Sequence, residues 1–346
     1  MIFRQIFDSE SATYTYLLAP HEGGEALIID PVAQKVGQYL TLLDELDLRL
    51  MKAIDTHVHA DHISGLAALR DATRCITVIG ADAAVDCVSR RVADGECIEI
   101  DGLALRTLQT PGHTPESCCF LWENAVFTGD TLLIRGTGRT DFQNGSAAAQ
   151  YDSLFKKLLT LPDATLVYPG HDYRGNTVST IGEEKRFNPR LQVASKKDYV
   201  GLMGDLHLAD PKMMDVAVPA NLTPGLDQRD INRHGWSLDA RRLQKLLAGE
   251  KPLLIDLRDR EERARHGVIP GSTHIPYGDL DNTIGPGGLL NKLAPAARRG
   301  IVFYCAHGER SAMAVTASRQ AGLGRAVHLA GGFDDWQRQG GAVERL

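Results

Sequence analysis

Several features that would place this chain in a particular class of protein are missing from its sequence. No apolar run approaches the length that crosses a bilayer, and residues 1–8 lack the apolar core and small-residue cleavage site of a signal peptide. The net charge is −6 and no basic block occurs, which argues against a nucleic-acid surface. We therefore expect a cytoplasmic protein with neither a membrane nor a nucleic-acid partner.

Cysteine is scarce, and none of the six cysteines forms a C-x-x-C pair. Five of them lie in or beside apolar segments and are expected to be reduced core thiols: Cys75, Cys87, Cys97, Cys118 and Cys119. Cys305 stands alone in a different setting. Internal repeats and low-complexity segments are also absent.

What is present indicates two domains, because 346 residues with 43% hydrophobic composition exceed the size of one typical core. The first part alternates β-rich and helical patterns, which indicates a layered α/β domain. Strands are expected at residues 14–18, 26–30, 51–55, 76–79, 103–109, 118–121, 125–128 and 165–168. Helices are expected at residues 34–46, 61–70 and 147–159.

The last third shows a pattern typical of a small parallel-sheet domain. Its expected strands are residues 253–257, 274–276, 301–304 and 326–329, and its expected helices are residues 260–266 and 311–321. Residues 219–235 are rich in Pro, Gly, Asn and Asp without an apolar period, so we expect a linker there. The predicted domains are residues 1–225 and 237–346, with the linker at 226–236.

The segment Thr56-His57-Val58-His59-Ala60-Asp61-His62 places three histidines and an aspartate directly after an apolar run. In a strand, alternate side chains share a face, so His57 and His59 point the same way. Imidazoles and a carboxylate that converge at a strand-to-helix turn indicate a transition-metal site. The alternative is a polar loop with scattered histidines, but such a loop has no reason to repeat this spacing.

Further ligand types follow other β-rich runs. His113 lies in Thr-Pro-Gly-His-Thr, Asp130 in Phe-Thr-Gly-Asp, and His171 and Asp172 in Tyr-Pro-Gly-His-Asp. Each follows a Pro or Gly turn, so all can converge at one edge of a sheet. Any single one, such as His171, could be an ordinary loop histidine. Together, in this order, they favour a common metal site.

This order of ligands resembles the metallo-β-lactamase superfamily over roughly residues 1–225, which implies an αββα sandwich. The superfamily pattern assigns His57, His59 and His113 to one metal, Asp61, His62 and His171 to a second, and Asp130 to the bridge. All seven residues are present, so the pattern alone leaves the number of metals open.

The strings between the ligands resemble the persulfide dioxygenases. They cover residues 132–143, 172–180, 188–190 and 216–221. The long helical C-terminal region of glyoxalase II, a binuclear zinc hydrolase of the same superfamily, has no counterpart here. One departure is Thr137, where some family members carry a cysteine.

The resemblance implies one iron(II) per chain, held by the residues that match the family's ligands: His57, His113 and Asp130. Two imidazoles and one carboxylate leave three open coordination positions, enough for a persulfide sulfur and dioxygen. The implied reaction oxidises glutathione persulfide to sulfite and glutathione. The remaining candidates would orient the ligands or a bound water, or else bind a second metal: His59, Asp61, His62 and His171.

Glutathione recognition requires cations for two carboxylates and donors for peptide groups. Arg139 and Tyr173 lie close in sequence to metal ligands and are the first candidates. Asp141 could pair with the substrate amine or hold Arg139. Arg174 and Lys212 are weaker candidates, and for these two and Asp141 a solvated surface charge is an equal alternative.

A second candidate site follows the apolar run 301–304. The string Cys305-Ala306-His307-Gly308-Glu309-Arg310-Ser311 precedes a helical pattern. A cysteine between a strand and a helix N-terminus lies among backbone N–H groups, and the helix dipole and Arg310 favour its thiolate, so Cys305 is a candidate nucleophile. The alternative is a buried structural thiol.

Four residues separate Cys305 from Arg310, whereas cysteine phosphatases of related shape have five. The shorter loop resembles the rhodanese sulfurtransferases, which carry sulfane sulfur as a cysteine persulfide. The resemblance covers roughly residues 235–346 and implies a doubly wound domain with a parallel sheet. Arg258 is a candidate contact for an anionic sulfur donor, or else a structural ion-pair residue.

We therefore interpret the chain as a persulfide dioxygenase fused to a rhodanese. The expected partners are glutathione persulfide, glutathione, dioxygen and thiosulfate or sulfite. A binuclear zinc thioesterase with a passenger rhodanese stays open, as does a C-terminal domain that acts only as a persulfide carrier or sensor. The oligomeric state is open, with a homodimer as one candidate.

Overall fold

The structure is a computed structural model that describes residues 1–85, 88–206, 208, 211, 213–223, 228–249, 252–297 and 300–346. It divides into two compact units. The first comprises Met1–Val85 and Arg91–Leu222, and the second comprises Thr223–Leu346 with a short segment that ends at Arg90. Among the described residues, no helix combines the length and apolar character needed to span a bilayer.

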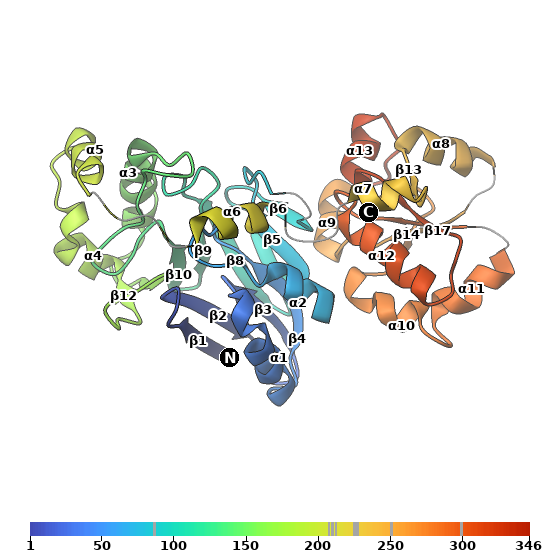
Figure 1. Cartoon of the computed structure of the whole chain (residues 1–346), viewed down its shortest axis with the longest axis horizontal. Helices are drawn as coiled ribbons and strands as arrows, with labels where there is room; N and C mark the ends of the chain where they lie inside the picture. Colours follow the sequence, from blue (N-terminus) through green and yellow to red (C-terminus); the bar gives the residue numbers. More distant parts are fainter. Residues whose placement is uncertain are drawn as a thin grey trace. The chain divides into compact units, whose positions relative to one another are not determined.

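The first unit contains two six-stranded sheets (Figure 1). The first sheet is built, in spatial order, from β1 (Ile2–Asp8), β2 (Thr13–Ala19), β3 (Glu25–Ile29), β4 (Arg49–Ile54), β5 (Ile76–Gly80) and β6 (Arg90–Val92). The second is built from β12 (Ser179–Thr180), β11 (Leu166–Pro169), β10 (Ala125–Gly129), β9 (Cys118–Trp122), β8 (Leu103–Gln109) and β7 (Cys97–Ile100).

The main core of this unit lies between the two sheets. Alternation along each strand sends one set of side chains inward, as Tyr16, Leu27 and Phe127 show, and these pack in a single buried cluster. The outer face of the first sheet packs against α1 (Val36–Glu45) and α2 (Leu66–Thr73). The outer face of the second packs against α3 (Ala147–Lys156), α4 (Ile181–Phe187) and α5 (Lys196–Gly204). The predicted αββα sandwich is confirmed.

The cysteines of this unit behave as core residues. Cys118 and Cys119 are adjacent on β9, and they contribute to the buried clusters on opposite faces of the second sheet. Cys75 is buried and Cys97 is partly exposed, and each described cysteine is a free thiol. Cys87 lies outside the described residues.

One predicted helix begins later than expected. Residues 61–70 were predicted to be helical, but α2 begins at Leu66. The side chain of Asn221 accepts a hydrogen bond from the backbone N–H of Ser64 and donates to the carbonyl oxygens of His59 and His62. These bonds hold the segment in a loop and leave its side chains free to converge.

Asn221 belongs to a helix that was not predicted, α6 (Met214–Leu222), which contains Pro219. This helix lies inside the predicted first domain, residues 1–225, and enters the Pro- and Gly-rich stretch 219–235. A further helix, α7 (Gln228–Arg233), lies in the segment predicted to be linker. Burial of Ala217 and Asn221 against the first unit outweighs the local preference of proline.

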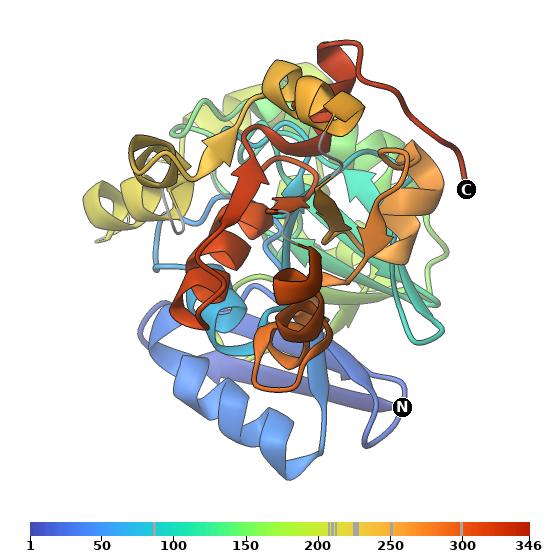
Figure 2. The same cartoon turned by 90° about the vertical axis from the view of Figure 1, so that its right-hand side faces the viewer.

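The second unit is a doubly wound domain around a five-stranded parallel sheet, as predicted (Figure 2). In spatial order its strands are β13 (Ser237–Leu238), β17 (Ala326–Leu329), β16 (Ile301–Tyr304), β14 (Leu253–Asp256) and β15 (Thr273–His274). One face packs against α10 (Leu280–Ile284), α11 (Leu289–Ala297) and α12 (Glu309–Gln320). The other packs against α8 (Ala240–Gly249) and α13 (Gly332–Arg338), while α9 (Arg260–His266) follows β14.

Candidate metal centre and cysteine loop

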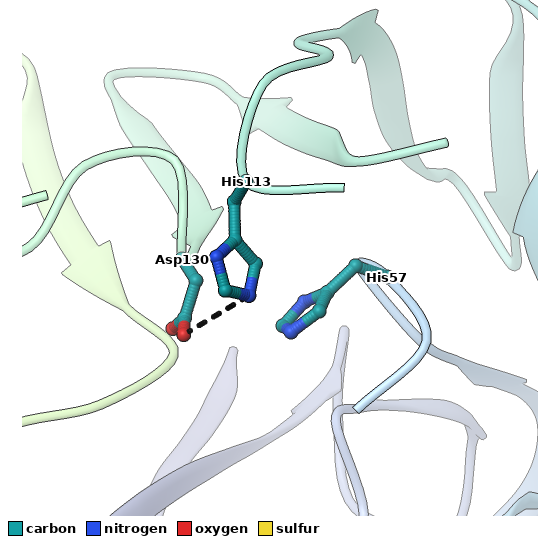
Figure 3. Close-up of side chains that lie close together, drawn as sticks. All are labelled: His57, His113 and Asp130. Carbon is teal, nitrogen blue, oxygen red and sulfur yellow. Dashed lines mark ion pairs between the residues drawn. The ribbon is translucent and has the colours of Figure 1, made fainter. Parts of the chain in front are cut away.

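Three predicted ligands meet at one edge of the sandwich. His57 follows β4, His113 follows β8 and Asp130 directly follows β10, and their side chains point toward one another (Figure 3). One ligand atom from each lies within 4.8 Å of the others. The Nε2 atom of His113 is 3.6 Å from Oδ2 of Asp130, and the rings of His57 and His113 are 4.8 Å apart at an angle of 82°.

The far nitrogen of each imidazole is held by the protein. Nδ1 of His57 lies 2.9 Å from Oγ1 of Thr56, whose hydroxyl donates to Asp30, so the ring nitrogen acts as the donor. Nδ1 of His113 donates to the carbonyl oxygen of Arg139 over 2.7 Å. In a neutral ring, both bonds place the proton on Nδ1 and leave the lone pair of Nε2 to bind a metal. The donor set therefore fits a metal ion.

Two glycines allow the loops that carry the predicted ligands to approach one another closely. Gly129 has φ +48°, and a Cβ atom there would lie 2.4 Å from Oγ1 of Thr56. A Cβ atom on Gly138 would lie 2.2 Å from the carbonyl oxygen of Asp130 and 2.9 Å from Nδ1 of His113. The glycines of these two strings are required by the close approach of the ligand-bearing loops.

Other predicted ligands form a second cluster beside the first. Nδ1 of His171 lies 2.6 Å from Oδ1 of Asp130, and its Nε2 lies 2.9 Å from Oδ2 of Asp61. Oγ1 of Thr13 lies 3.1 Å from the same Nε2, and Nδ1 of His62 lies 2.9 Å from Asp61. Both nitrogens of His171 are therefore engaged by other side chains.

A second metal is still compatible with the donors. His59, Asp61 and His62 offer ligand atoms within 4.8 Å of one another. Nδ1 of His59 and Nε2 of His62 are buried without a hydrogen-bond partner, while Nε2 of His59 lies 3.2 Å from Oδ1 of Asp30. The donors of this second cluster therefore also suit a metal ion.

Burial and neighbouring charges set the protonation of the ligands. Burial, and then the adjacent imidazoles of His59 and His113, hold the pKa of His57 well below its usual value, so His57 is neutral. Burial alone would raise the pKa of Asp130, but His171 and His113 outweigh it and keep the group a carboxylate. For His171, burial is outweighed by Asp130 and Asp61, which raise the pKa well above its usual value.

A cavity of about 280 Å³ opens beside two of the three predicted ligands, His113 and Asp130. It is lined by His113, Asp130, Arg139 and Tyr173, among others. Arg139 forms a two-pronged ion pair with Asp141, at 2.6 and 2.7 Å, and its guanidinium lies 5.0 Å from the ring centre of Phe142. Asp141 thus holds Arg139, one of the two roles left open for it by the sequence.

The other predicted glutathione contacts differ in their settings. Tyr173 is 74% exposed and its ring stacks parallel to His171 at 6.1 Å. Arg174 is exposed at the rim of the same cavity. Lys212 lies outside the described residues.

Arg190 lines this cavity and was not singled out from the sequence. It is half-buried, and its Nη1 donates to the carbonyl and hydroxyl oxygens of Thr137. Within the described part of the chain no carboxylate pairs with it, and burial lowers the pKa of its guanidinium. In the sequence, Arg190 is marked only by its place in the Asn-Pro-Arg string. Whether a carboxylate pairs with this cation depends on the tertiary structure, so the sequence could not show it.

The cysteine loop joins β16 to α12. Cys305 is buried, and its Sγ accepts a hydrogen bond from the backbone N–H of Gly308 over 3.1 Å. Sγ also lies 3.7 Å from Oγ of Ser311. Gly308 has φ +96°, a conformation that favours glycine and turns its N–H toward the sulfur. Ala306 and His307 complete the loop, and Glu309 begins α12.

Two buried arginines flank the loop. Arg310 pairs with Glu262 through Nη1 and Nη2, at 2.8 and 2.6 Å, and its buried Nε has no partner among the residues that the structure describes. Arg258 pairs with Asp256 at 2.8 Å, and its guanidinium lies 3.9 Å from the ring centre of Phe333. Arg258 therefore takes the structural ion-pair role that the sequence left open.

Comparisons with known proteins agree with the division of the chain into two units. The profile of the metallo-β-lactamase superfamily matches residues 9–171, and that of the rhodanese-like domain matches residues 239–339. The human protein "Persulfide dioxygenase ETHE1, mitochondrial" is 45% identical over 233 residues, which cover 65% of this chain and 89% of the relative. The mouse protein of the same name is 44% identical over the same coverage.

Solved structures show the same relationship. The crystal structure of ETHE1 from Myxococcus xanthus is 51% identical, with a TM-score of 0.62 over 64% of this chain and 98% of that one. A metallo-β-lactamase structure from Staphylococcus aureus is 22% identical, with a TM-score of 0.61 over 96% of this chain and 98% of that one, which supports the fold alone. The chain therefore belongs to the persulfide dioxygenase family of the metallo-β-lactamase superfamily and carries a C-terminal rhodanese domain.

Proposed function

We propose that the first unit oxidises glutathione persulfide with dioxygen and water to glutathione and sulfite, using one iron(II) per chain. The observation that carries this proposal is a single cavity in which His113 and Asp130 of the three-ligand set lie beside Arg139, Tyr173 and the unpaired Arg190. The donor set suits a metal with open coordination positions, and the cations suit the carboxylates of a glutathione tail.

The chemistry that iron supplies when bound is electron exchange between a sulfur ligand and dioxygen. His57, His113 and Asp130 would hold it. The protein's own part is to place the substrate: Arg139 and Arg190 bind its carboxylates, and His171 fixes the orientation of Asp130 through Oδ1. Summed over the reaction, the outer sulfur gains three oxygens, two from dioxygen and one from water, and the inner sulfur leaves as the thiol.

We propose that the second unit transfers sulfane sulfur between thiosulfate and glutathione. The thiolate of Cys305 attacks the outer sulfur of thiosulfate, the S–S bond breaks, and its electron pair leaves with sulfite. The thiolate of glutathione then attacks the outer sulfur of the Cys305 persulfide, which restores the Cys305 thiolate and releases glutathione persulfide. The buried Nε–H of Arg310, which has no partner, supports an anionic donor at this loop.

The two proposed steps share glutathione persulfide, so one chain would both form and consume it. Residence of both sites on one chain raises the local concentration of the intermediate without a channel.

Metal analysis together with an oxygen-electrode trace tests the dioxygenase proposal. The expected result is one iron per chain and oxygen uptake with glutathione persulfide, which the His57→Ala variant loses. Two zinc ions, hydrolysis of a glutathione thioester and no oxygen uptake would instead support the binuclear thioesterase, which the His59, Asp61 and His62 cluster makes the second candidate.

A coupled assay tests the second unit. Cys305→Ser should abolish sulfur transfer from thiosulfate to glutathione and leave oxygen uptake intact. Transfer that survives this substitution contradicts the role of Cys305. A wild-type chain that accepts one sulfur at Cys305 and passes none to glutathione would indicate a carrier or sensor instead.

A further inference from the structure

A buried histidine stands behind the cysteine loop, and the proposed sulfur transfer does not use it. His328 lies on β17 and is fully buried. Its Nδ1 is 3.3 Å from Oγ of Ser311, which in turn is 3.7 Å from Sγ of Cys305. A line of contacts therefore runs from the sulfur through one hydroxyl to one imidazole.

The hydrogen-bond inventory of Ser311 identifies which nitrogen of His328 carries the proton. A hydroxyl offers one proton and two lone pairs. Ser311 donates its proton to the carbonyl oxygen of Gly308 over 3.0 Å, so the thiol of Cys305 and the ring of His328 both approach as donors. If the proton were on Nε2, Nδ1 of His328 and the carbonyl oxygen of Gly308 would both be acceptors. The two would then compete for the single proton of the Ser311 hydroxyl. Nδ1 of His328 is therefore the donor.

The remaining nitrogen agrees with this assignment. Among the described residues, Nε2 of His328 has no hydrogen-bond partner, so this buried nitrogen carries the lone pair rather than an unsatisfied N–H. Burial lowers the pKa of His328 to about 4, so the ring is neutral near pH 7. His328 therefore contributes a directed hydrogen bond and no charge.

We propose that His328 is a positioning residue that acts on Cys305 through Ser311. Its Nδ1–H occupies one lone pair of the Ser311 hydroxyl, which then donates its proton to the sulfur once Cys305 is a thiolate or a persulfide. Together with the N–H of Gly308, at 3.1 Å from Sγ, this gives the anionic sulfur two donors. The inference rests on the proposed sulfur transfer at Cys305.

Two substitutions separate the hydrogen bond from the packing. Asparagine places its amide nitrogen near the position of Nδ1, whereas leucine has a similar bulk and no donor. His328→Leu should slow alkylation of Cys305 by iodoacetamide at pH 7 about tenfold, since Ser311 is no longer oriented to donate its hydrogen bond to the charged sulfur. His328→Asn should stay within about twofold of the wild type.

The measurements use the full-length chain. Alkylation is followed by mass spectrometry of the peptide that contains Cys305, so the other cysteines do not interfere. Sulfur transfer from thiosulfate to glutathione is followed in parallel, and kcat should fall more than KM rises. Oxygen uptake with glutathione persulfide should not change in either variant.

The path through Ser311 is tested by a double-mutant cycle. Adding His328→Leu to Ser311→Ala should cause no further loss in the alkylation rate, because the hydroxyl through which His328 acts is already gone. Rate losses that multiply would overturn the proposal, as would equal rates for His328→Leu and His328→Asn. If His328→Leu does not fold, His328→Gln takes its place, because its amide nitrogen lies away from the position of Nδ1. The alkylation rates of His328→Gln and His328→Asn are then compared in the same way.

The alkylation readout keeps this inference separate from the proposed function. Iodoacetamide requires no sulfur donor, so a wild-type chain that transfers no sulfur would refute the sulfurtransferase proposal, while the alkylation rates still report on His328.

Discussion

Nδ1 of His171 lies 2.6 Å from Oδ1 of Asp130, while Oδ2 of the same carboxylate lies 3.6 Å from Nε2 of His113. One oxygen of Asp130 is thus engaged by a histidine and the other faces the metal ligands. The far side of His171 is engaged by Asp61, 2.9 Å from Nε2. This chain of contacts fixes the carboxylate before any metal binds and underlies the first prediction.

His171→Asn should weaken metal binding about 10- to 100-fold without changing the metal-to-chain ratio from one, because it removes an orienting partner and not a ligand. Metal titration of the metal-free chain, monitored by calorimetry, measures both quantities. A ratio that falls from two to one would instead show that His171 is a ligand to a second metal.

Arg190→Gln should raise KM for glutathione persulfide about tenfold or more and change kcat much less, since a charge-assisted hydrogen bond to a substrate carboxylate is lost. The matched control is Arg174→Gln, which removes an exposed arginine at the rim of the same cavity. A control that raises KM as much as Arg190→Gln does would show that the general positive charge, and not Arg190, recognises the substrate.

Asp256→Asn should destabilise the second unit by about 3–5 kcal/mol, because it leaves the buried guanidinium of Arg258 without its counter-charge. Urea unfolding, followed in the full chain, measures the effect. Asp334→Asn is the control: this residue pairs with Arg338 on an exposed surface, so the expected loss is below about 1 kcal/mol. Equal losses for the two variants would contradict the role given to the buried pair.

The second unit should lose stability as the pH falls from about 6.5 toward 4. The pKa of His328 is lowered by burial to about 4, so between these values the unfolded chain binds a proton that the folded chain does not. The loss attributable to this group reaches roughly 3 kcal/mol. Comparing the pH dependence of unfolding for the wild type and His328→Asn isolates it, since every other titratable group is shared. Identical slopes would contradict the low pKa.

The sequence determined much of this protein because the informative signals are local. The candidate metal ligands are residue types at fixed spacings after short strands, and the cysteine loop is one continuous string. Alternation along strands and ligand position at strand ends follow from backbone geometry, which needs no knowledge of distant partners. Both domain folds and most strand positions were therefore predictable, whereas strands β1, β6, β7, β12 and β13 were not predicted.

Partners distant in the sequence were decided only by the tertiary structure. Thr13 reaches His171 across 158 positions, and Asn221 holds the loop before α2 across 157 positions from Ser64. Arg190 and His328 gain their significance from what surrounds them: a cavity in which no described carboxylate pairs with Arg190, and a hydroxyl beside Cys305. Side-chain partnership depends on how separate elements pack, and local sequence preference carries no information about that packing.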